Sequence, residues 1–259
     1  MLDLAYVLAG ALTGFVVGIT GVGGGALMTP ILLLFFGVAP ATAIAADLWF
    51  AAITKMAGAR VHHTAGNIDW YVAKRLWLGS LPMALLTVIL VGMGAHIAKV
   101  DGLTRAIGVV VLITAAGLLL APRLAVIART HHTNNPGKFK AAQPALTVLS
   151  GAILGLCVAL TSVGAGAMGS VMLLFLYPSR MAPHRLVATD IVHAIPLAMV
   201  AGTGYLFAGM VDWLMLLSLL AGSVPAVILS SLLARKVTGR WIQIALALVL
   251  IAAGIKFVI

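Results

Sequence analysis

Apolar segments long enough to cross a membrane follow one another along almost the whole chain. Six are clear, and each is close to the roughly 20 residues that a membrane-spanning helix needs: 41–60, 76–97, 103–121, 184–207, 214–234 and 241–259. Of the 259 residues, 63% are hydrophobic and 8% are charged, whereas an ordinary soluble domain is about 25% charged. The sequence therefore predicts an all-α polytopic membrane protein, and it excludes a cytosolic enzyme, a nucleic-acid-binding protein and a disordered chain.

Two further apolar stretches, 4–38 and 145–177, are each interrupted by a glycine-rich break. A glycine inside a helix costs about 1 kcal/mol relative to alanine, so a cluster of glycines is expected to end one helix and let another begin. Each stretch is therefore predicted to form a hairpin of two short helices, either re-entrant or crossing as two tilted spans. The two breaks read Gly21-Val22-Gly23-Gly24-Gly25 and Ser162-Val163-Gly164-Ala165-Gly166.

The two halves of the chain match each other in order. One alignment brings the two glycine-rich breaks into register, and after a short insertion a second brings the segments that follow into register. These matches indicate an internal duplication, with one repeat at 1–121, a polar cytoplasmic linker at 122–144 and a second repeat at 145–259. The clearest matches pair Gly10 with Gly151, Gly14 with Gly155, Asp47 with Asp190, Asp69 with Asp212 and Gly79 with Gly222.

Each repeat holds one hairpin and three spans, which makes an odd net number of crossings, so the second repeat is predicted to be inverted. The basic residues support this topology. With the N-terminus outside, most of them fall in inner loops, as membrane proteins generally require, and the net charge of +10 needs no nucleic-acid partner. We therefore predict a bacterial-type inner membrane protein with both termini outside. The inner residues are Arg60, Lys74, Arg75, Arg123, Arg129, Lys138, Lys140, Arg180, Arg185, Arg235, Lys236 and Arg240.

Inverted repeats with broken helices are the common plan of secondary transporters, which bind substrate near the midplane. After each break a new helix begins, near Ala26 and near Ala167, and its free amides suit a small anion. Glycines that merely let helices pack closely are the alternative interpretation. The candidate substrate-binding residues are Thr20, Gly23, Gly24, Gly25, Thr161, Ser162, Gly164 and Gly166.

Four titratable residues inside the predicted spans are candidates for proton coupling or gating: Asp47, Asp190, His193 and Lys55. A carboxylate in hydrocarbon is costly and normally faces protein or water. Asp47 and Asp190 either carry a coupling proton or accept hydrogen bonds that hold a hairpin in place. His193 either exchanges a proton or packs as a hydrogen-bonded residue. Lys55 either attracts the anion or extends its amine to the cytoplasmic interface.

The glycine-rich breaks carry a family resemblance. Gly21-Val22-Gly23-Gly24-Gly25-Ala26, followed by an apolar segment and Pro40 to Asp47, resembles the sulfite exporter TauE/SafE family. The second break, followed by Pro183 to Asp190, is similar to the duplicated pattern of that family. The resemblance implies transport of small sulfur-containing anions such as sulfite, sulfonates or sulfoacetate, often out of the cytoplasm. Trp49, Lys55 and the His62-His63 pair depart from the typical first half and leave the substrate open.

The leading hypothesis is a secondary transporter of such anions, and the alternatives are an anion channel or a transporter of other small organic anions. Neither a Walker-type loop nor a catalytic set of residues is evident in the sequence, so we expect neither ATP hydrolysis nor an enzyme. Adjacent histidines, as in His62-His63 and His131-His132, make a poor metal site, and no metal or cofactor is expected. The expected partners are the anion, the lipid bilayer and, in a homo-oligomer, a second copy.

Overall fold

The fold is known from a computed structural model that describes residues 3–20, 25–63, 68–92, 102, 105, 107–117, 119–120, 136–164, 166–178, 180–233 and 239–258. Regular structure in these ranges is entirely helical. In chain order the helices are α1 (Leu4–Thr20), α2 (Gly25–Phe35), α3 (Pro40–His63), α4 (Trp70–Gly92), the unlabelled segment Ile107–Gly117, α6 (Pro136–Thr161), α7 (Ala167–Leu176), α8 (Pro183–Phe207), α9 (Trp213–Leu233) and α10 (Gly239–Val258).

Both helix breaks that the glycine clusters predict are confirmed. The first falls between α1 and α2 and the second between α6 and α7. The second helix of each hairpin is short, with 11 residues in α2 and 10 in α7. At 1.5 Å per residue these helices are about 15–16 Å long, which is about half the thickness of a bilayer's hydrocarbon core. Their length favours re-entrant hairpins over pairs of tilted spans.

Two helices begin earlier than the apolar pattern predicts. α4 begins at Trp70 rather than at 76, because Asp69 caps it by accepting a hydrogen bond from the backbone N–H of Val72 (3.3 Å). α6 begins at Pro136 and so takes in part of the linker predicted at 122–144. Proline is favoured in the first turn of a helix, and the lysines and alanines that follow favour helix too. Hydropathy detects only the apolar part of such helices.

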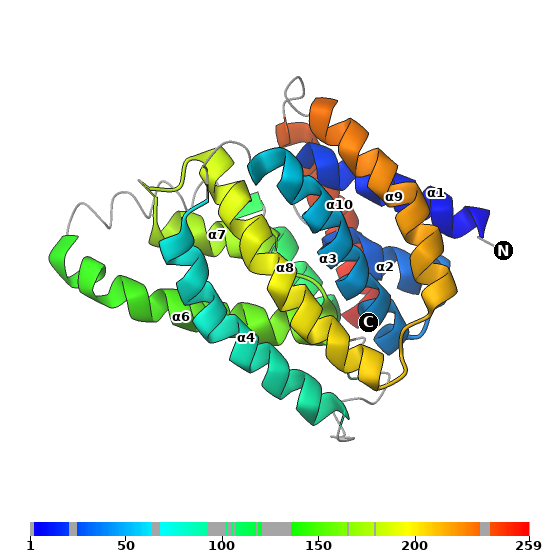
Figure 1. Ribbon diagram of the computed structural model, residues 1–259, viewed down its shortest axis with the longest axis horizontal. Helices are drawn as coiled ribbons and strands as arrows, with labels where there is room; N and C mark the ends of the chain where they lie inside the picture. The colour runs from blue at the N-terminus through cyan, green and yellow to red at the C-terminus, as the bar shows by residue number, and fades with distance from the viewer. Residues whose placement is uncertain are drawn as a thin grey trace.

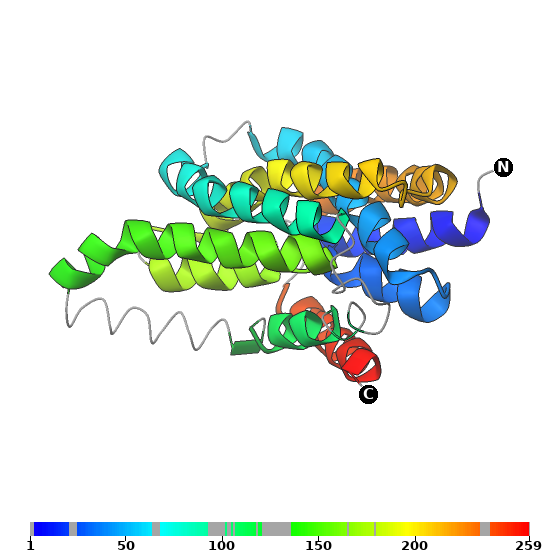
Figure 2. The same cartoon turned by 90° about the horizontal axis from the view of Figure 1, so that it is seen from below.

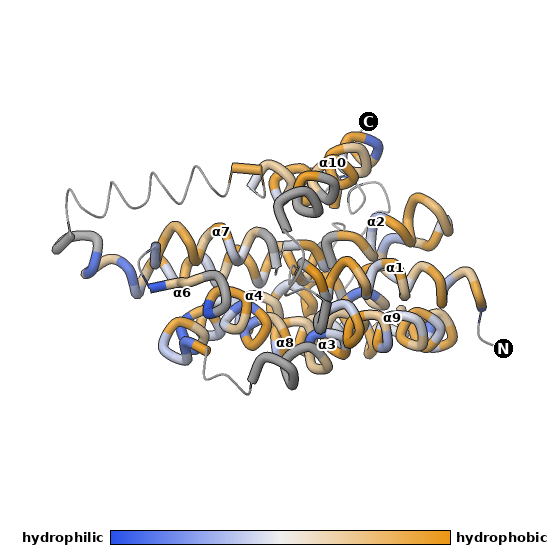
Figure 3. The backbone as a smooth tube through the Cα atoms, turned by 90° about the horizontal axis from the view of Figure 1, so that it is seen from above, coloured by the Kyte–Doolittle hydropathy of each residue, from blue (hydrophilic) through white to orange (hydrophobic). Residues whose placement is uncertain are grey.

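Four helices of the described part are long and apolar enough to cross a membrane, at Trp70–Val91, Lys140–Thr161, Arg185–Phe207 and Trp213–Ser230. α3 is also long, at 24 residues, but it is less apolar because Asp47 and Lys55 lie within it. The protein is an integral membrane protein by this measure. Figure 3 shows the same distribution along the backbone, with hydrophilic residues near the start of α6 and apolar residues along most of the helices.

α3 and α8 lie side by side in the middle of the molecule (Figure 1). α1 packs along α9 on one side of this pair, and α6 packs along α4 on the other. α1 starts at the side of the molecule where the N-terminus lies, on the right in Figure 1, and runs toward the middle. α6 starts at the opposite side and also runs toward the middle (Figures 1 and 2). The two hairpins thus enter from opposite ends, which agrees with the predicted inversion.

Matched glycines make matched contacts with exchanged partners. A Cβ atom on Gly10 of α1 would collide with the backbone of Leu219 in α9, and one on Gly151 of α6 would collide with the backbone of Leu76 in α4. Leu76 and Leu219 are themselves paired by the alignment that matches the segments after the breaks. The first helix of each half therefore packs against the other half in the same way. This reciprocity is what a two-fold relation between the repeats requires.

The contacts of Gly79 and Gly222 provide a test of this helix packing. A Cβ atom on Gly79 would collide with the carbonyl oxygen of Val148, and one on Gly222 would collide with that of Val7. We expect Gly79→Ala and Gly222→Ala each to destabilise the protein by about 1–3 kcal/mol, the usual cost of overpacking. The melting temperature of the purified protein in detergent measures this loss.

Gly117→Ala is the matched control, because the nearest atom to its added Cβ, in Val171, is 3.7 Å away. Its melting temperature should stay close to that of the wild type. An unchanged melting temperature for both Gly79→Ala and Gly222→Ala would contradict the close approach of α4 to α6 and of α9 to α1.

Candidate transport site

Asp47 holds the second helix of the first hairpin in place. Its Oδ2 atom accepts a hydrogen bond from the Thr29 hydroxyl (2.5 Å) and another from the Thr29 backbone N–H (3.2 Å). Both residues are fully buried. Asp47 lies on α3 and Thr29 on α2, so the carboxyl group joins the hairpin to the central helices. The proposed structural role of Asp47, accepting hydrogen bonds from the hairpin, matches this geometry.

The second hairpin turns at Ser162 and Gly164, which both have left-handed backbone conformations, with φ of 57° and 117°. Glycine adopts this conformation freely, whereas a residue with a side chain is strained in it. The Thr161 hydroxyl is engaged within the turn, where it donates to the Cys157 carbonyl (2.7 Å) and accepts from the Val163 N–H (3.1 Å). Thr161 thus shapes the turn.

Two polar atoms meet beside this turn without hydrogen-bond partners. The Ser162 hydroxyl of the second hairpin lies close to the Asp47 carboxyl group. Within the described part of the chain, however, neither Ser162 Oγ nor Asp47 Oδ1 has a hydrogen-bond partner. Ser162 is 4% exposed and Asp47 is 0% exposed. Buried polar groups from the two halves of the chain therefore lie close together beside the turn.

Asp190, the match of Asp47, has a different partner. Its Oδ2 atom lies 3.4 Å from the Lys55 amine, and the two side chains are 2% and 4% exposed. The ion pair joins α3 of the first half to α8 of the second. The alternative in which Lys55 extends to the cytoplasmic interface is wrong, because the buried carboxylate of Asp190 holds its amine inside the protein. Asp190 Oδ1 lies against Gly169 of α7, where an added Cβ atom would be 2.7 Å away.

His193 belongs to the same region of α8. Its Nε2 atom is 3.0 Å from the Ser80 hydroxyl of α4, while its Nδ1 atom has no hydrogen-bond partner among the described residues. The Trp77 indole N–H donates to the His193 backbone carbonyl (3.2 Å). Sequence reasoning missed Trp77 and Ser80 as partners of His193. Ser80 lies in one of the segments matched between the repeats, which was the available signal.

The four titratable candidates form two groups rather than one. Lys55 follows Asp47 by about two helical turns on α3, which corresponds to a rise of about 12 Å along the helix. Asp47 contacts the first hairpin and lies beside the turn of the second. Lys55 pairs with Asp190 two helical turns further along α3. His193 lies one turn after Asp190. The structure therefore separates Asp47 from the other three groups.

Three of the remaining sequence candidates flank the two helix breaks. Gly25 is the first residue of α2, and Gly166 directly precedes α7. Thr20 is the last residue of α1. Gly23 and Gly24 lie outside the described residues.

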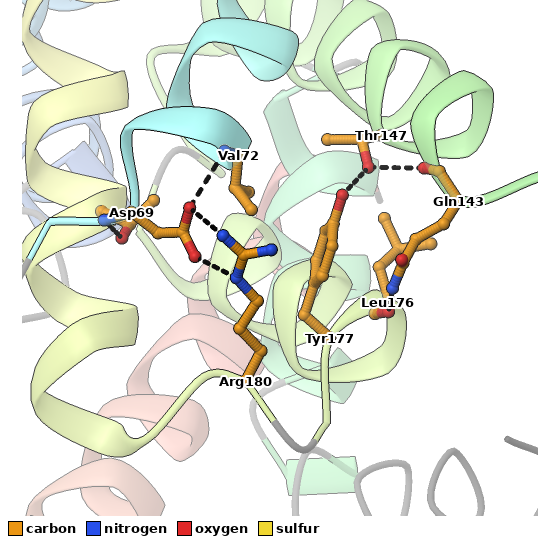
Figure 4. Close-up of polar contacts among 8 residues, drawn as sticks. Asp69, Val72, Gln143, Thr147, Leu176, Tyr177 and Arg180 are labelled. Carbon is orange, nitrogen blue, oxygen red and sulfur yellow. Dashed lines mark hydrogen bonds and ion pairs between the residues drawn. The ribbon is translucent and has the colours of Figure 1, made fainter. Parts of the chain in front are cut away.

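The end of the second hairpin away from its turn is anchored by a polar cluster (Figure 4). The Arg180 guanidinium donates two hydrogen bonds to the carboxylate of Asp69, at 2.5 and 3.0 Å. The Tyr177 hydroxyl lies 2.8 Å from the Thr147 hydroxyl, and the Gln143 amide donates to the Leu176 carbonyl. The segments before α4 and after α7, both predicted on the inner side, lie together.

The family model described as "Sulfite exporter TauE/SafE" matches residues 6–257 of this chain. The chain belongs to this family. Its relatives include "Probable membrane transporter protein YjnA" of Bacillus subtilis (strain 168), which is 31% identical over 99% of this chain and 100% of that protein. Another, "Probable membrane transporter protein YdhB" of the same organism, is 26% identical over 85% of this chain and 86% of its own length. No solved structure gives a significant match.

Membership in the TauE/SafE family makes the protein a membrane transporter. The family resemblance stated from the glycine-rich breaks is thereby confirmed over nearly the whole chain.

The buried ion pair provides a test of the site's geometry. Removing one partner of a buried pair leaves the other charge uncompensated, which typically costs about 3–5 kcal/mol. We therefore expect Lys55→Met and Asp190→Asn each to lower the melting temperature in detergent. The double variant, with both charges removed, should recover most of the loss. Additive losses in the double variant would show that the two side chains do not pair.

Proposed function

We propose that this TauE/SafE family member is a secondary transporter that exports small sulfur-containing anions, such as sulfite or organosulfonates, across a bacterial inner membrane. The observation that carries the proposal is the reciprocal arrangement of the hairpins, which enter from opposite ends and pack against the opposite half of the chain. Transporters with two-fold related repeats and broken helices bind substrate between the repeats. In this proposal both termini lie outside.

The starts of α2 and α7 are the proposed anion site. A helix N-terminus presents free N–H groups and a partial positive charge, and α7 begins shortly after the left-handed Gly164. The bare backbone at Gly164 and Gly166 lets an anion approach closely. The Ser162 hydroxyl offers a further donor. Thr20, Gly23, Gly24 and Gly25 are proposed to act in the same way at the start of α2, and Thr161 supports the second turn.

Lys55 is proposed to attract the anion electrostatically. It is a buried cation in contact with the second half of the chain, through its pair with Asp190. An arriving anion competes with Asp190 for the same amine, because each offers negatively charged oxygen atoms. Exchange of one for the other would loosen a contact between α3 and α8 and so link anion binding to movement between the two halves.

The proposal is tested by transport assays with the purified protein in proteoliposomes. A panel of sulfite, a sulfonate such as sulfoacetate and a carboxylate such as acetate compares the chemical classes directly. We expect saturable transport of the sulfur-containing anions and stimulation by the same anion on the opposite side. Stimulation from the opposite side distinguishes a carrier from a channel, which would show neither saturation nor exchange. Preference for the carboxylate would instead favour a transporter of other organic anions.

The double variant Lys55→Met/Asp190→Asn tests the role of Lys55. It removes both charges, so it should fold while lacking the cation that draws the anion in. We expect a raised KM for sulfite and a reduced transport rate. The conservative variant Lys55→Arg keeps the charge and should retain more activity than the double variant. Wild-type kinetics in the double variant would assign Lys55 and Asp190 to stability alone.

A further inference from the structure

The two matched carboxyl groups differ in one electrostatic respect. Asp190 is neutralised by Lys55, but Asp47 forms no ion pair in the described part of the chain. The repeat relation explains why. The alignment that places Asp47 on Asp190 also places Lys55 on Ala198. Where the two-fold relation would supply a second lysine to Asp47, the chain has a buried alanine.

The helices packed around Asp47 supply no other counter-charge. α2, α7 and α9 contain no titratable side chain. The titratable residues of α8 are His184, Arg185, Asp190, His193 and Tyr205. Asp190 pairs with Lys55, His193 with Ser80, and the Tyr205 hydroxyl donates to the Ala159 carbonyl. An uncompensated carboxylate in an apolar interior is very costly. A neutral, protonated carboxyl group avoids this cost.

Ser162 provides the matching acceptor. In the alignment of the two glycine-rich breaks it corresponds to Gly21, and its φ of 57° is a conformation that glycine adopts without strain. A serine here is strained because its Cβ crowds the following carbonyl oxygen, and it also buries a hydroxyl group that has no partner among the described residues. Strained residues that persist in this way are concentrated at functional sites.

A single proton completes the hydrogen bonding of this contact. With the proton on Oδ1, the Asp47 carboxyl group can donate to Ser162 Oγ, while Oδ2 accepts from the Thr29 hydroxyl and N–H as observed. Without it, Ser162 must become the donor and the carboxylate keeps its charge. The state of Asp47 therefore determines how the second hairpin bonds to the first half.

We propose that Asp47, together with Ser162 and Thr29, is the binding site for the proton that is coupled to anion movement. The proton binds Asp47 Oδ1 from water on one side of the membrane and leaves to water on the other. The inference rests on the proposed function for the identity of the coupled anion, but the site itself depends only on the contacts among these three residues. Asp190, neutralised by Lys55, is assigned no such proton.

Infrared spectroscopy tests the site without any substrate. The protein in lipid at neutral pH should show the C=O stretch of a protonated carboxyl group, which is lost in Asp47→Asn and kept in Asp190→Asn. Ser162→Ala should shift its frequency, because the acceptor is removed. Ser223→Ala is the matched control, since Ser223 also has a buried hydroxyl without a partner but is not part of this site, and it should leave the band unchanged. Persistence of the band in Asp47→Asn would overturn the proposal, as would an unshifted band in Ser162→Ala.

Transport assays test the coupling. In proteoliposomes, an imposed pH gradient should drive accumulation of radiolabelled sulfite by the wild type. In Asp47→Asn this accumulation should fall to the level of protein-free liposomes, while sulfite exchange at equal pH remains measurable. Accumulation that still follows the pH gradient in this variant would overturn the coupling role. Absence of sulfite exchange in the wild type would instead reject the proposed substrate, while the infrared band would still decide the proton site.

Discussion

Close contact between helix backbones at glycine residues is the constraint on which the rest of this structure depends. In a membrane there is little hydrophobic gain from bringing two apolar helices together, so association relies on close packing and small residues. Gly10 and Gly222 bring α1 against α9, and Gly79 and Gly151 bring α4 against α6. These contacts attach each hairpin to the opposite half of the chain. The short helices α2 and α7 are thereby held against the rest of the molecule, because the longer helices α1 and α6 of the same hairpins are packed in place.

The same two-fold relation makes the departures from symmetry informative. Most of the matched positions that define the repeat carry similar residues, but Lys55 is matched by Ala198 and Ser162 by Gly21. The substitutions leave one buried carboxyl group paired with a cation and the other facing a hydroxyl group. A transporter that moves an anion together with a proton needs two chemically different sites. A duplicated chain can provide two such sites when a residue near one carboxyl group differs from its match near the other, as Lys55 differs from Ala198 and Ser162 from Gly21.

The arrangement also separates stability from function within one hairpin. The end of the second hairpin away from its turn is fixed by the bidentate pair of Arg180 and Asp69 and by the Tyr177–Thr147 contact. Its turn is bonded through Thr161 but also holds the strained Ser162, whose hydroxyl has no hydrogen-bond partner in the described part of the chain. A hairpin that is firmly bonded at one end and incompletely bonded at its turn can respond at the turn while its base stays in place. This is the distribution of stability that a binding element requires.

Much of the fold could be predicted because a membrane reduces the choice of structures. Backbone groups in hydrocarbon must bond within their own segment, so apolar stretches become helices, and glycine clusters mark where α1 and α6 end. The early starts of α4 and α6 were not predicted because their first turns are polar. For the site, the sequence placed Asp47, Asp190, Lys55 and His193 within helices, and the structure buries all four side chains, but sequence reasoning could not assign their partners. The role of Lys55 stayed open because its long side chain can either remain inside the protein or extend to the cytoplasmic interface. The position of Asp190 decides between these two directions.

The amino-acid sequence by itself determined the membrane environment, the helix breaks, the duplication and the family, because each follows from local composition or from matches along the chain. Only the tertiary structure decided which residues meet. Asp47 and Ser162 lie in different halves of the chain, and so do Lys55 and Asp190. Each of these contacts joins one half to the other, and no local pattern specifies it. The packing of α3 against α8 brings Lys55 to Asp190, and the approach of the second hairpin brings Ser162 to Asp47. The difference between the two carboxyl groups therefore depends on the tertiary structure.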